Sequence, residues 1–226
     1  TDWWDDEGYF GIMESYSSYK DSGVEWIGEI PRDWDTNKVK FVSTIKRGSS
    51  PRPIDEPKYF EDGGEYGWVR ISDVTKCGKY LTNTIQQLSE LGKSCSLPLE
   101  NDTLCMSISG SVGKVFITRI KCCIHDGFVS FNNLLINQDF LYLLLTNKEL
   151  YSEDRKLGTQ FNINSQLVGN KKIPIPNITE QTQIVEYLDE QTQKIDSTIE
   201  KETQRIELLK EYRQSLISEV VTGKVD

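Results

Sequence analysis

Between residues 36 and 175, the apolar residues come in short runs that are separated by turn-forming residues. The runs are rich in β-branched and aromatic side chains, and Gly63-Gly64, Ser109-Gly110 and Asp126-Gly127 lie between them. Runs of this kind, bounded by glycine-containing breaks, are typical of β-strands. We therefore predict a sheet-rich globular domain with strands near residues 39–45, 67–71, 103–108, 115–120 and 128–131.

One helix is expected to interrupt these strands. Asp139 precedes Phe140, Leu141, Leu144 and Leu145, whose spacing places them on one helical face. An aspartate can cap the first turn of a helix through its side-chain oxygens. The segment after residue 138 is therefore predicted to form a helix that begins at Asp139.

The clearest periodicity lies at the C-terminus, after Pro174 and Pro176. Thr179 and Glu180 give a helix-start signal, and Gly223 gives a C-terminal stop. Between them, alternating spacings of three and four residues define a stripe in which eight of eleven positions are apolar: Val185, Leu188, Thr192, Ile195, Ile199, Glu202, Ile206, Leu209, Arg213, Leu216 and Val220. A helix of this length measures roughly 63 Å at 1.5 Å per residue. The fold class is therefore α+β, a sheet-rich domain followed by a long coiled-coil helix.

So long a stripe predicts a partner helix, because the preceding domain is too small to bury it. Polar Thr192, Glu202 and Arg213 lie within the stripe, and buried polar groups are costly unless they find complements. An antiparallel pair that placed Glu202 of one chain near Arg213 of another would satisfy both. The alternative is that the helix packs along its own domain with these polar positions exposed.

The charge is divided unevenly along the chain. The 226 residues carry a net charge of -9, but residues 1–35 contribute -8, residues 36–175 contribute +4 and residues 176–226 contribute -5. A basic section between acidic ends favours nucleic-acid contact by the middle section. We expect an acidic N-terminal segment at 1–18, appended or flexible, a DNA-binding domain at 19–178 and the long helix at 179–226.

Several other features narrow the class of protein. The five cysteines, Cys77, Cys95, Cys105, Cys122 and Cys123, have no C-x-x-C spacing, so reduced thiols are expected. The single histidine, His125, is interpreted as structural. There is neither a run of about 18 apolar residues nor a secretory signal, so we predict no membrane contact and a cytoplasmic location.

Two short motifs partly match known catalytic or phosphate-binding patterns. Residues 110–114, GSVGK, lack the spacing of a phosphate-binding loop and are predicted to be a glycine-rich turn between two strands. Glu56 and Lys58 supply the E-x-K half of a nuclease metal site, without a convincing second carboxylate. No histidine-based nucleophile relay is possible. We predict no catalytic site and no metal site.

Three stretches resemble the specificity (S) subunits of type I restriction-modification systems. They are residues 19–34, YKDSGVEWIGEIPRDW; residues 158–164, GTQFNIN, with the IPIP, EQ and YLD motifs that follow; and residues 216–226, LISEVVTGKVD. The resemblance covers nearly the whole chain after residue 18. It identifies residues 19–178 as a target recognition domain and the long helix as a spacer.

This resemblance implies a non-catalytic subunit that reads one half of a split DNA target and docks methyltransferase (M) subunits. No cofactor is expected in this chain; S-adenosylmethionine, ATP and Mg are expected on the M and restriction/motor (R) partner subunits. Typical members have two recognition domains and two long helices. This chain is therefore either a half-length subunit, acting as an antiparallel dimer with a second copy of itself, or a fragment of a full one.

The candidate contacts with double-stranded DNA follow from chemistry alone. Arg and Lys suit phosphates, and Arg, Lys, Ser, Thr, Asn and Gln suit base edges. The candidates are Lys46, Arg47, Ser49, Ser50, Arg52, Arg70, Lys114, Thr159, Gln160 and Asn162. A metal-dependent nuclease using Glu56 and Lys58 and a coiled-coil adaptor that binds protein are the alternative functions.

Overall fold

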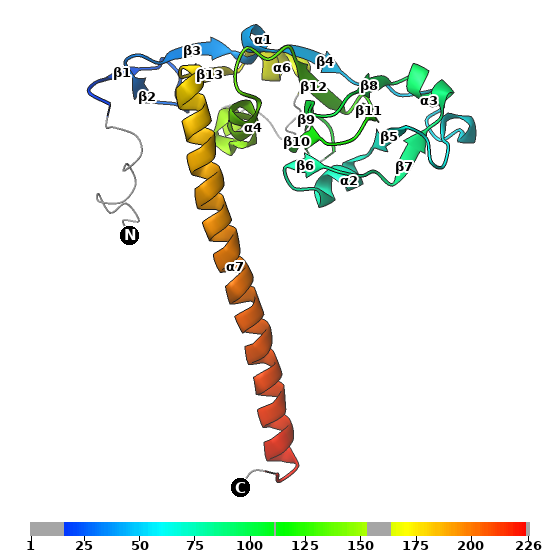
Figure 1. Ribbon diagram of the computed structural model, residues 1–226, viewed down its shortest axis with the longest axis vertical. Helices are drawn as coiled ribbons and strands as arrows, with labels where there is room; N and C mark the ends of the chain where they lie inside the picture. Colours follow the sequence, from blue (N-terminus) through cyan, green and yellow to red (C-terminus); the bar gives the residue numbers. More distant parts are fainter. Residues whose placement is uncertain (1–15, 111, 153–163, 225–226) are drawn as a thin grey trace. The chain divides into compact units, whose positions relative to one another are not determined.

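The fold is described from a computed structural model, which defines residues 16–110, 112–152 and 164–224 (Figure 1). The chain divides into two compact units, the first ending at Gln181 and the second beginning at Thr182. Within the described residues, no helix is long and apolar enough to cross a membrane.

A five-stranded sheet forms the centre of the first unit. Its strands lie in the order β4 (Thr44–Arg47), β12 (Phe128–Asn132), β9 (Leu104–Ser107), β10 (Val115–Thr118) and β6 (Tyr80–Leu81). Neighbouring strands are antiparallel except for β10 and β6, which are parallel. β9 and β10 are buried along their whole length, which explains why their sequences are apolar runs rather than alternating patterns.

A four-stranded sheet lies in the same unit. Its order is β7 (Gln86–Leu88), β5 (Tyr66–Val69), β11 (Cys122–Ile124) and β8 (Leu97–Leu99), and only β5 and β11 run parallel. Arg119 to Lys121 link β10 of the first sheet to β11 of the second, and the turn at 125–127 leads back to β12. The chain therefore passes from the five-stranded sheet into the four-stranded sheet and returns through the turn 125–127.

The remaining elements are short. Two further two-stranded sheets pair β1 (Tyr19–Asp21) with β2 (Glu29–Pro31) and β3 (Asp35–Lys38) with β13 (Lys172–Ile175). The helices of this unit are α1 (Val39–Val42), η1 (Pro57–Tyr59), α2 (Ile71–Lys76), α3 (Glu90–Ser94), α4 (Gln138–Thr146), η2 (Lys148–Tyr151) and α6 (Ser165–Asn170).

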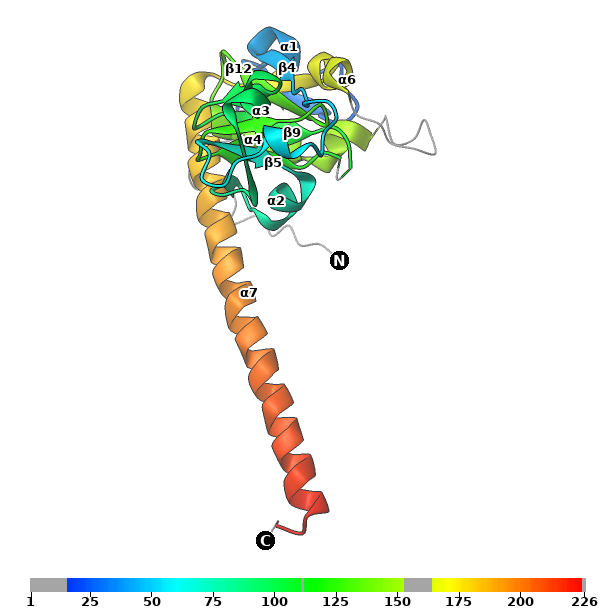
Figure 2. The ribbon, with the colours of Figure 1, turned by 90° about the vertical axis from the view of Figure 1, so that its right-hand side faces the viewer.

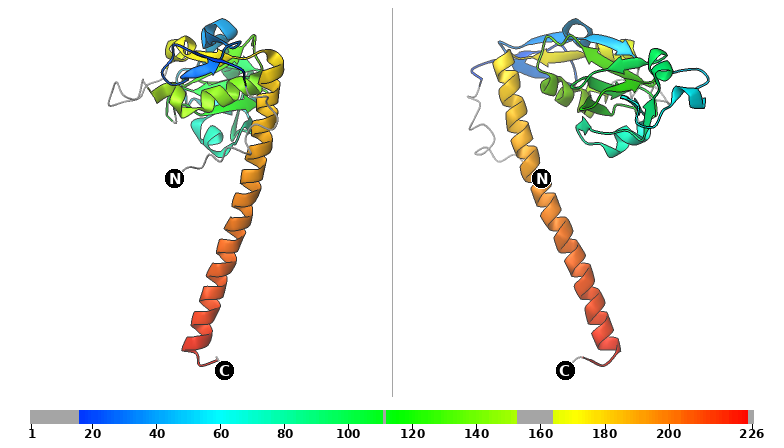
Figure 3. Two further views of the ribbon diagram at one scale, coloured as in Figure 1. Left: turned by 90° about the vertical axis from the view of Figure 1, so that its left-hand side faces the viewer. Right: turned by 45° about the vertical axis from the view of Figure 1, so that its right-hand side comes forward.

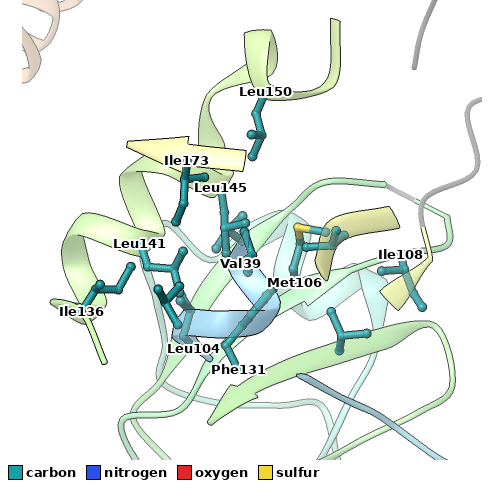
Figure 4. Packing of buried hydrophobic residues seen from close by; sticks show 14 of the residues in the cluster. Val39, Leu104, Met106, Ile108, Phe131, Ile136, Leu141, Leu145, Leu150 and Ile173 are labelled. Carbon is teal, nitrogen blue, oxygen red and sulfur yellow. The ribbon is translucent and has the colours of Figure 1, made fainter. Parts of the chain in front are cut away.

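The largest hydrophobic core lies between the five-stranded sheet and α4. Leu141 and Leu145 of α4 join Leu104 of β9 and Phe131 of β12 in this cluster, and all four are almost fully buried (Figure 4). Burying each such side chain contributes roughly 1.5–3 kcal/mol. This core fixes the sheet from which the site loops project.

Most of the predicted strands are confirmed, but one is wrong. Residues 39–45 were expected to form a single strand, whereas Val39–Val42 is a helical turn and only Thr44–Arg47 is a strand. Val39 and Val42, three residues apart, are both buried, while Phe41 is 60% exposed. Spacing of three suits a helical turn, and a strand would have required alternation.

The start of the predicted helix near residue 139 also needs correction. The cap is Asn137, whose side-chain oxygen accepts hydrogen bonds from the backbone N–H groups of Asp139 and Phe140 at 2.9 and 3.1 Å. Asp139 instead lies in the first turn and pairs with Lys79, with 2.9 Å between the charged atoms. Asparagine and aspartate cap helices equally well, so the sequence alone could not decide between them.

The C-terminal helix α7 (Ile178–Val221) is 44 residues long and uninterrupted (Figures 2 and 3). Asn177 caps it, because Asn177 Oδ1 accepts from the Glu180 N–H at 3.0 Å and Glu180 Oε2 accepts from the Asn177 N–H at 3.3 Å. Gly223, with φ of 65°, follows the last turn as expected of a C-terminal stop. The long helix predicted from the stripe is confirmed.

Candidate nucleic-acid interface

The basic turn that follows β4 is fastened to the turn at 125–127. Gly48 N donates to the Phe128 carbonyl at 3.0 Å, and Ser49 N donates to the Ile124 carbonyl at 3.1 Å. A Cβ on Gly48 would lie only 2.2 Å from the His125 carbonyl oxygen. Only glycine therefore permits this close approach of two backbones.

Asp126 fixes three of the side chains that were predicted to contact DNA. Its carboxylate accepts from Ser50 Oγ at 3.0 Å and from Arg52 Nη2 at 3.2 Å, and its backbone carbonyl accepts from Arg47 Nε at 2.8 Å. Burial raises the pKa of Asp126, but the Ser50 hydrogen bond and the Arg52 charge are the main effects that oppose burial, and the net shift is downward. The ionised carboxylate therefore holds Ser50 and Arg52 in place, and the backbone carbonyl of the same residue holds Arg47.

The hairpin loop between β9 and β10 joins the same place. The Gly127 carbonyl accepts from Ile108 N at 2.7 Å and from Ser109 N at 3.2 Å. Gly110 and Gly113 have positive φ angles of 71° and 84°, which glycine adopts without strain. The prediction of a glycine-rich turn between two strands is confirmed for the described residues of this loop.

Arg70 lies beside these loops, at the end of β5. Ile124, the last residue of β11, is the strand partner of Val69, the last residue of β5. Arg70 and His125 therefore each come directly after one of these two neighbouring parallel strands. Arg70 Nε donates to Gln86 Oε1 at 2.5 Å. A Cβ on Gly110 would lie 3.2 Å from Ile71, so the hairpin loop packs on the residue after Arg70.

His125 has a structural role, as predicted. Its ring lies 4.6 Å from the Phe128 ring and 5.8 Å from the Trp68 ring, measured between centroids. Its Nδ1 accepts from Gly127 N at 2.9 Å. Burial lowers the pKa of His125; the Asp126 charge opposes this shift and the Arg70 charge adds to it. A neutral imidazole therefore shapes the turn.

We call residues 46–52, 70–71, 108–110, 112–114 and 125–127 the basic loop cluster. It carries five basic side chains, Lys46, Arg47, Arg52, Arg70 and Lys114, against one carboxylate, Asp126. Segments far apart in sequence are thus held at the ends of β4, β5 and β9 and the start of β10. Such a concentration of cations suits a polyanion.

Lys46 and Lys114 are the first and last residues of their segments of the cluster. Lys46 is exposed on β4, where its strand partner is Ser130. Lys114 lines a cavity of about 450 Å³ together with Lys79 and Lys148. Thr159, Gln160 and Asn162 lie outside the described residues.

Sequence reasoning missed Asp126 and Gln86 as members of the site. The Asp126-Gly127 pair was visible only as a turn signal, and Gln86 carried no signal, because its role depends on the pairing of β7 with β5. The nuclease alternative gains nothing, since Glu56 forms an ion pair with Lys58 at 2.8 Å. Across residues 16–110, 112–152 and 164–224, no group of three His, Cys, Asp or Glu side chains could hold a metal.

The cysteines of the chain are free thiols. Cys105, Cys122 and Cys123 are buried, and burial raises the pKa of both Cys122 and Cys123 to about 12. These thiols are therefore protonated at neutral pH and unreactive.

The fold is shared with solved components of type I restriction-modification systems. One such chain, from work on the assembly and conformational transition of the type I system, has a TM-score of 0.68 and 22% identity over 84% of this chain and 46% of its own length. The S subunit (HsdS) of Thermoanaerobacter tengcongensis has a TM-score of 0.59 and 21% identity over 79% of this chain and 41% of its own.

Sequence comparison then gives the family. The model of the type I restriction modification DNA specificity domain matches residues 31–210, so the chain belongs to this family. It is 28% identical to the MjaVIII specificity subunit of Methanocaldococcus jannaschii over 95% of the chain, and 27% identical to the StySPI specificity subunit of Salmonella potsdam over 87%. The chain spans about half the length of these relatives, 51% and 44% respectively.

Proposed function

We propose that this chain reads one half of a bipartite DNA target for a type I restriction-modification complex. The observation that carries the proposal is the convergence of four separate segments into the basic loop cluster. The turn 125–127 accepts backbone hydrogen bonds from the hairpin loop and side-chain hydrogen bonds from Arg47, Ser50 and Arg52. A cluster ordered by its own hydrogen bonds can meet DNA with little loss of entropy.

The cluster contains both kinds of group that DNA recognition uses. Exposed Lys46 and Arg52 suit phosphates, and the half-buried Arg70 and Ser50 suit base edges. The surrounding protein is acidic, so affinity for non-specific DNA is expected to be weak and strongly salt-dependent.

The stripe of α7 defined above, from Val185 to Val220, supports an antiparallel dimer. If Glu202 faces Arg213 of a second copy, the same register places Ile206 opposite Leu209, Ile199 opposite Leu216 and Ile195 opposite Val220. The six apolar side chains are 40–63% exposed in the single chain. Each therefore has apolar surface left for a partner helix to cover, and Glu202 and Arg213 meet residues of opposite charge.

Such a dimer would present two recognition domains to an inverted-repeat target. The catalytic steps are assigned to partners: M subunits with S-adenosylmethionine would methylate the site, and R subunits would use ATP and Mg. This chain contributes the choice of sequence and the spacing between half-sites.

The test is a selection of random-sequence duplex DNA by this chain reconstituted with the M subunits of its own system. We expect a split motif with a fixed spacer to be enriched. The control is the M subunits alone, which should enrich no such motif. Failure of the complete assembly to enrich a split motif would contradict the proposal.

A further inference from the structure

Arg70 differs from the other arginines of the basic loop cluster in how it is held. Arg47 and Arg52 are both held by Asp126, and the Arg52 side chain is 74% exposed. Arg70 is half-buried, and its partner is Gln86, a neutral amide on β7. Its charge is therefore not balanced by an ion pair with a described carboxylate.

Gln86 is a well-fixed partner. It is paired in register with Trp68, whose side chain is fully buried, and its backbone carbonyl accepts from Thr84 Oγ1 at 2.9 Å. The Arg70 backbone is fixed too, because Arg70 N donates to Asp73 Oδ2 at 2.9 Å. Both ends of the Arg70–Gln86 hydrogen bond are thus anchored to regular structure.

This arrangement leaves the two terminal nitrogens of the Arg70 guanidinium available to donate hydrogen bonds to a ligand. The hydrogen bond to Gln86 uses Nε, and neither terminal nitrogen of Arg70 has a hydrogen-bond partner among the described residues. The group is planar, so fixing Nε orients the two terminal nitrogens as a fork. A fork of this kind matches two neighbouring acceptors on a rigid ligand.

We propose that Arg70 is a specificity-determining residue that reads a guanine, and that Gln86 is the residue that orients it. Guanine presents O6 and N7 in the major groove, and arginine binds both at once. The inference rests on the proposed function and adds a named base contact to it. A phosphate contact is the competing role, since phosphates also accept two hydrogen bonds.

The experiment repeats the random-DNA selection on the reconstituted assembly with three variants. Arg70→Lys keeps the charge but loses the fork, so we expect preference for guanine at one position of the half-site to fall roughly tenfold to a hundredfold. All other positions should keep their preferences. Gln86→Met removes the acceptor at similar volume and should weaken preference at that same position by a smaller factor.

The matched control is Arg119→Ala. Arg119 lies at the opposite end of β10 from the hairpin loop and pairs with Asp102, so its loss should leave the motif unchanged. If Arg70→Lys keeps the wild-type motif, or binds all sequences equally less well, the guanine assignment is wrong while the proposed function stands. If the wild-type assembly selects no motif, the proposed function fails and the assignment fails with it.

Discussion

The charged pairs that Glu202 and Arg213 would form in the stripe of α7 allow a direct test of the antiparallel pairing. Each such pair is one layer of the interface. In that pairing, Glu202 of each copy faces Arg213 of the other, so a dimer contains this layer twice. Glu202→Arg turns both layers into arginine pairs, and Arg213→Glu turns both into glutamate pairs. The double variant restores opposite charges with their places exchanged.

The magnitude follows from the exposure of these groups. The Glu202 side chain is 59% exposed, so a pair with it contributes about 0.5 kcal/mol and a like-charge pair costs about as much. Each layer therefore changes by about 1 kcal/mol and the dimer by about 2 kcal/mol, which is roughly thirtyfold in Kd. Glu202 also lies 3.8 Å from Arg205 of its own helix, but that loss is equal in monomer and dimer and cancels.

Sedimentation equilibrium at about 0.15 M salt, where exposed charges still interact over about 8 Å, measures the dimer Kd. We expect each single variant to weaken the dimer roughly thirtyfold, and the double variant to return to within about threefold of the wild type. Glu200→Arg is the matched control, because it makes the same charge change outside the stripe. A double variant as weak as the single ones, or a wild type that stays monomeric throughout the micromolar range, would refute the antiparallel register.

Three further predictions concern the recognition domain and are checked by unfolding experiments. Gly48→Ala should destabilise the fold by about 1–3 kcal/mol, because its Cβ would meet a carbonyl oxygen at 2.2 Å; Gly78→Ala, where a Cβ meets nothing within 4 Å, is the control and should cost far less. Leu141→Ala should cost about 2–5 kcal/mol through the cavity it leaves, whereas Leu135→Ala, at a side chain 76% exposed, should change stability by less than about 0.5 kcal/mol. Because the pKa of His125 is lowered in the folded state, the unfolded chain binds the proton more tightly, so stability should fall as pH drops below 6.5, by at most about 1.4 kcal/mol per pH unit. His125→Gln should reduce that slope, and an unchanged slope would show that another group titrates.

The sequence was most informative where a periodic pattern was long or where burial was complete. The stripe from Val185 to Val220 predicted α7, because a helical spacing repeated over so many positions is recognisable even though three of them are polar. The runs that became β9 and β10 were recognisable because strands buried on both faces must be continuously apolar. Short segments failed: Val39–Val42 has too few residues to distinguish a helical turn from a strand.

For the candidate site, the sequence determined the chemistry and the tertiary structure decided the geometry. The basic turn at 46–52 was evident from composition, and Arg70 and Lys114 could be named as cations of the same domain. Their neighbours could not be named, because Asp126 reaches Ser50 and Arg52 across more than 70 residues of sequence. Those contacts exist only because β4 pairs with β12, so that the turn joining β11 to β12 lies beside the residues that follow β4.

The pairing of Arg70 with Gln86 shows the same division most clearly. An arginine and a glutamine 16 residues apart carry no mutual signal in the sequence. Their hydrogen bond depends on the register of β5 with β7, which is set by the packing of whole sheets rather than by either residue. The sequence by itself determined a basic, sheet-rich domain, a long helix with an apolar seam and the family. Only the tertiary structure decided which side chains stand together, since long-range strand pairing is a property of the packed chain as a whole.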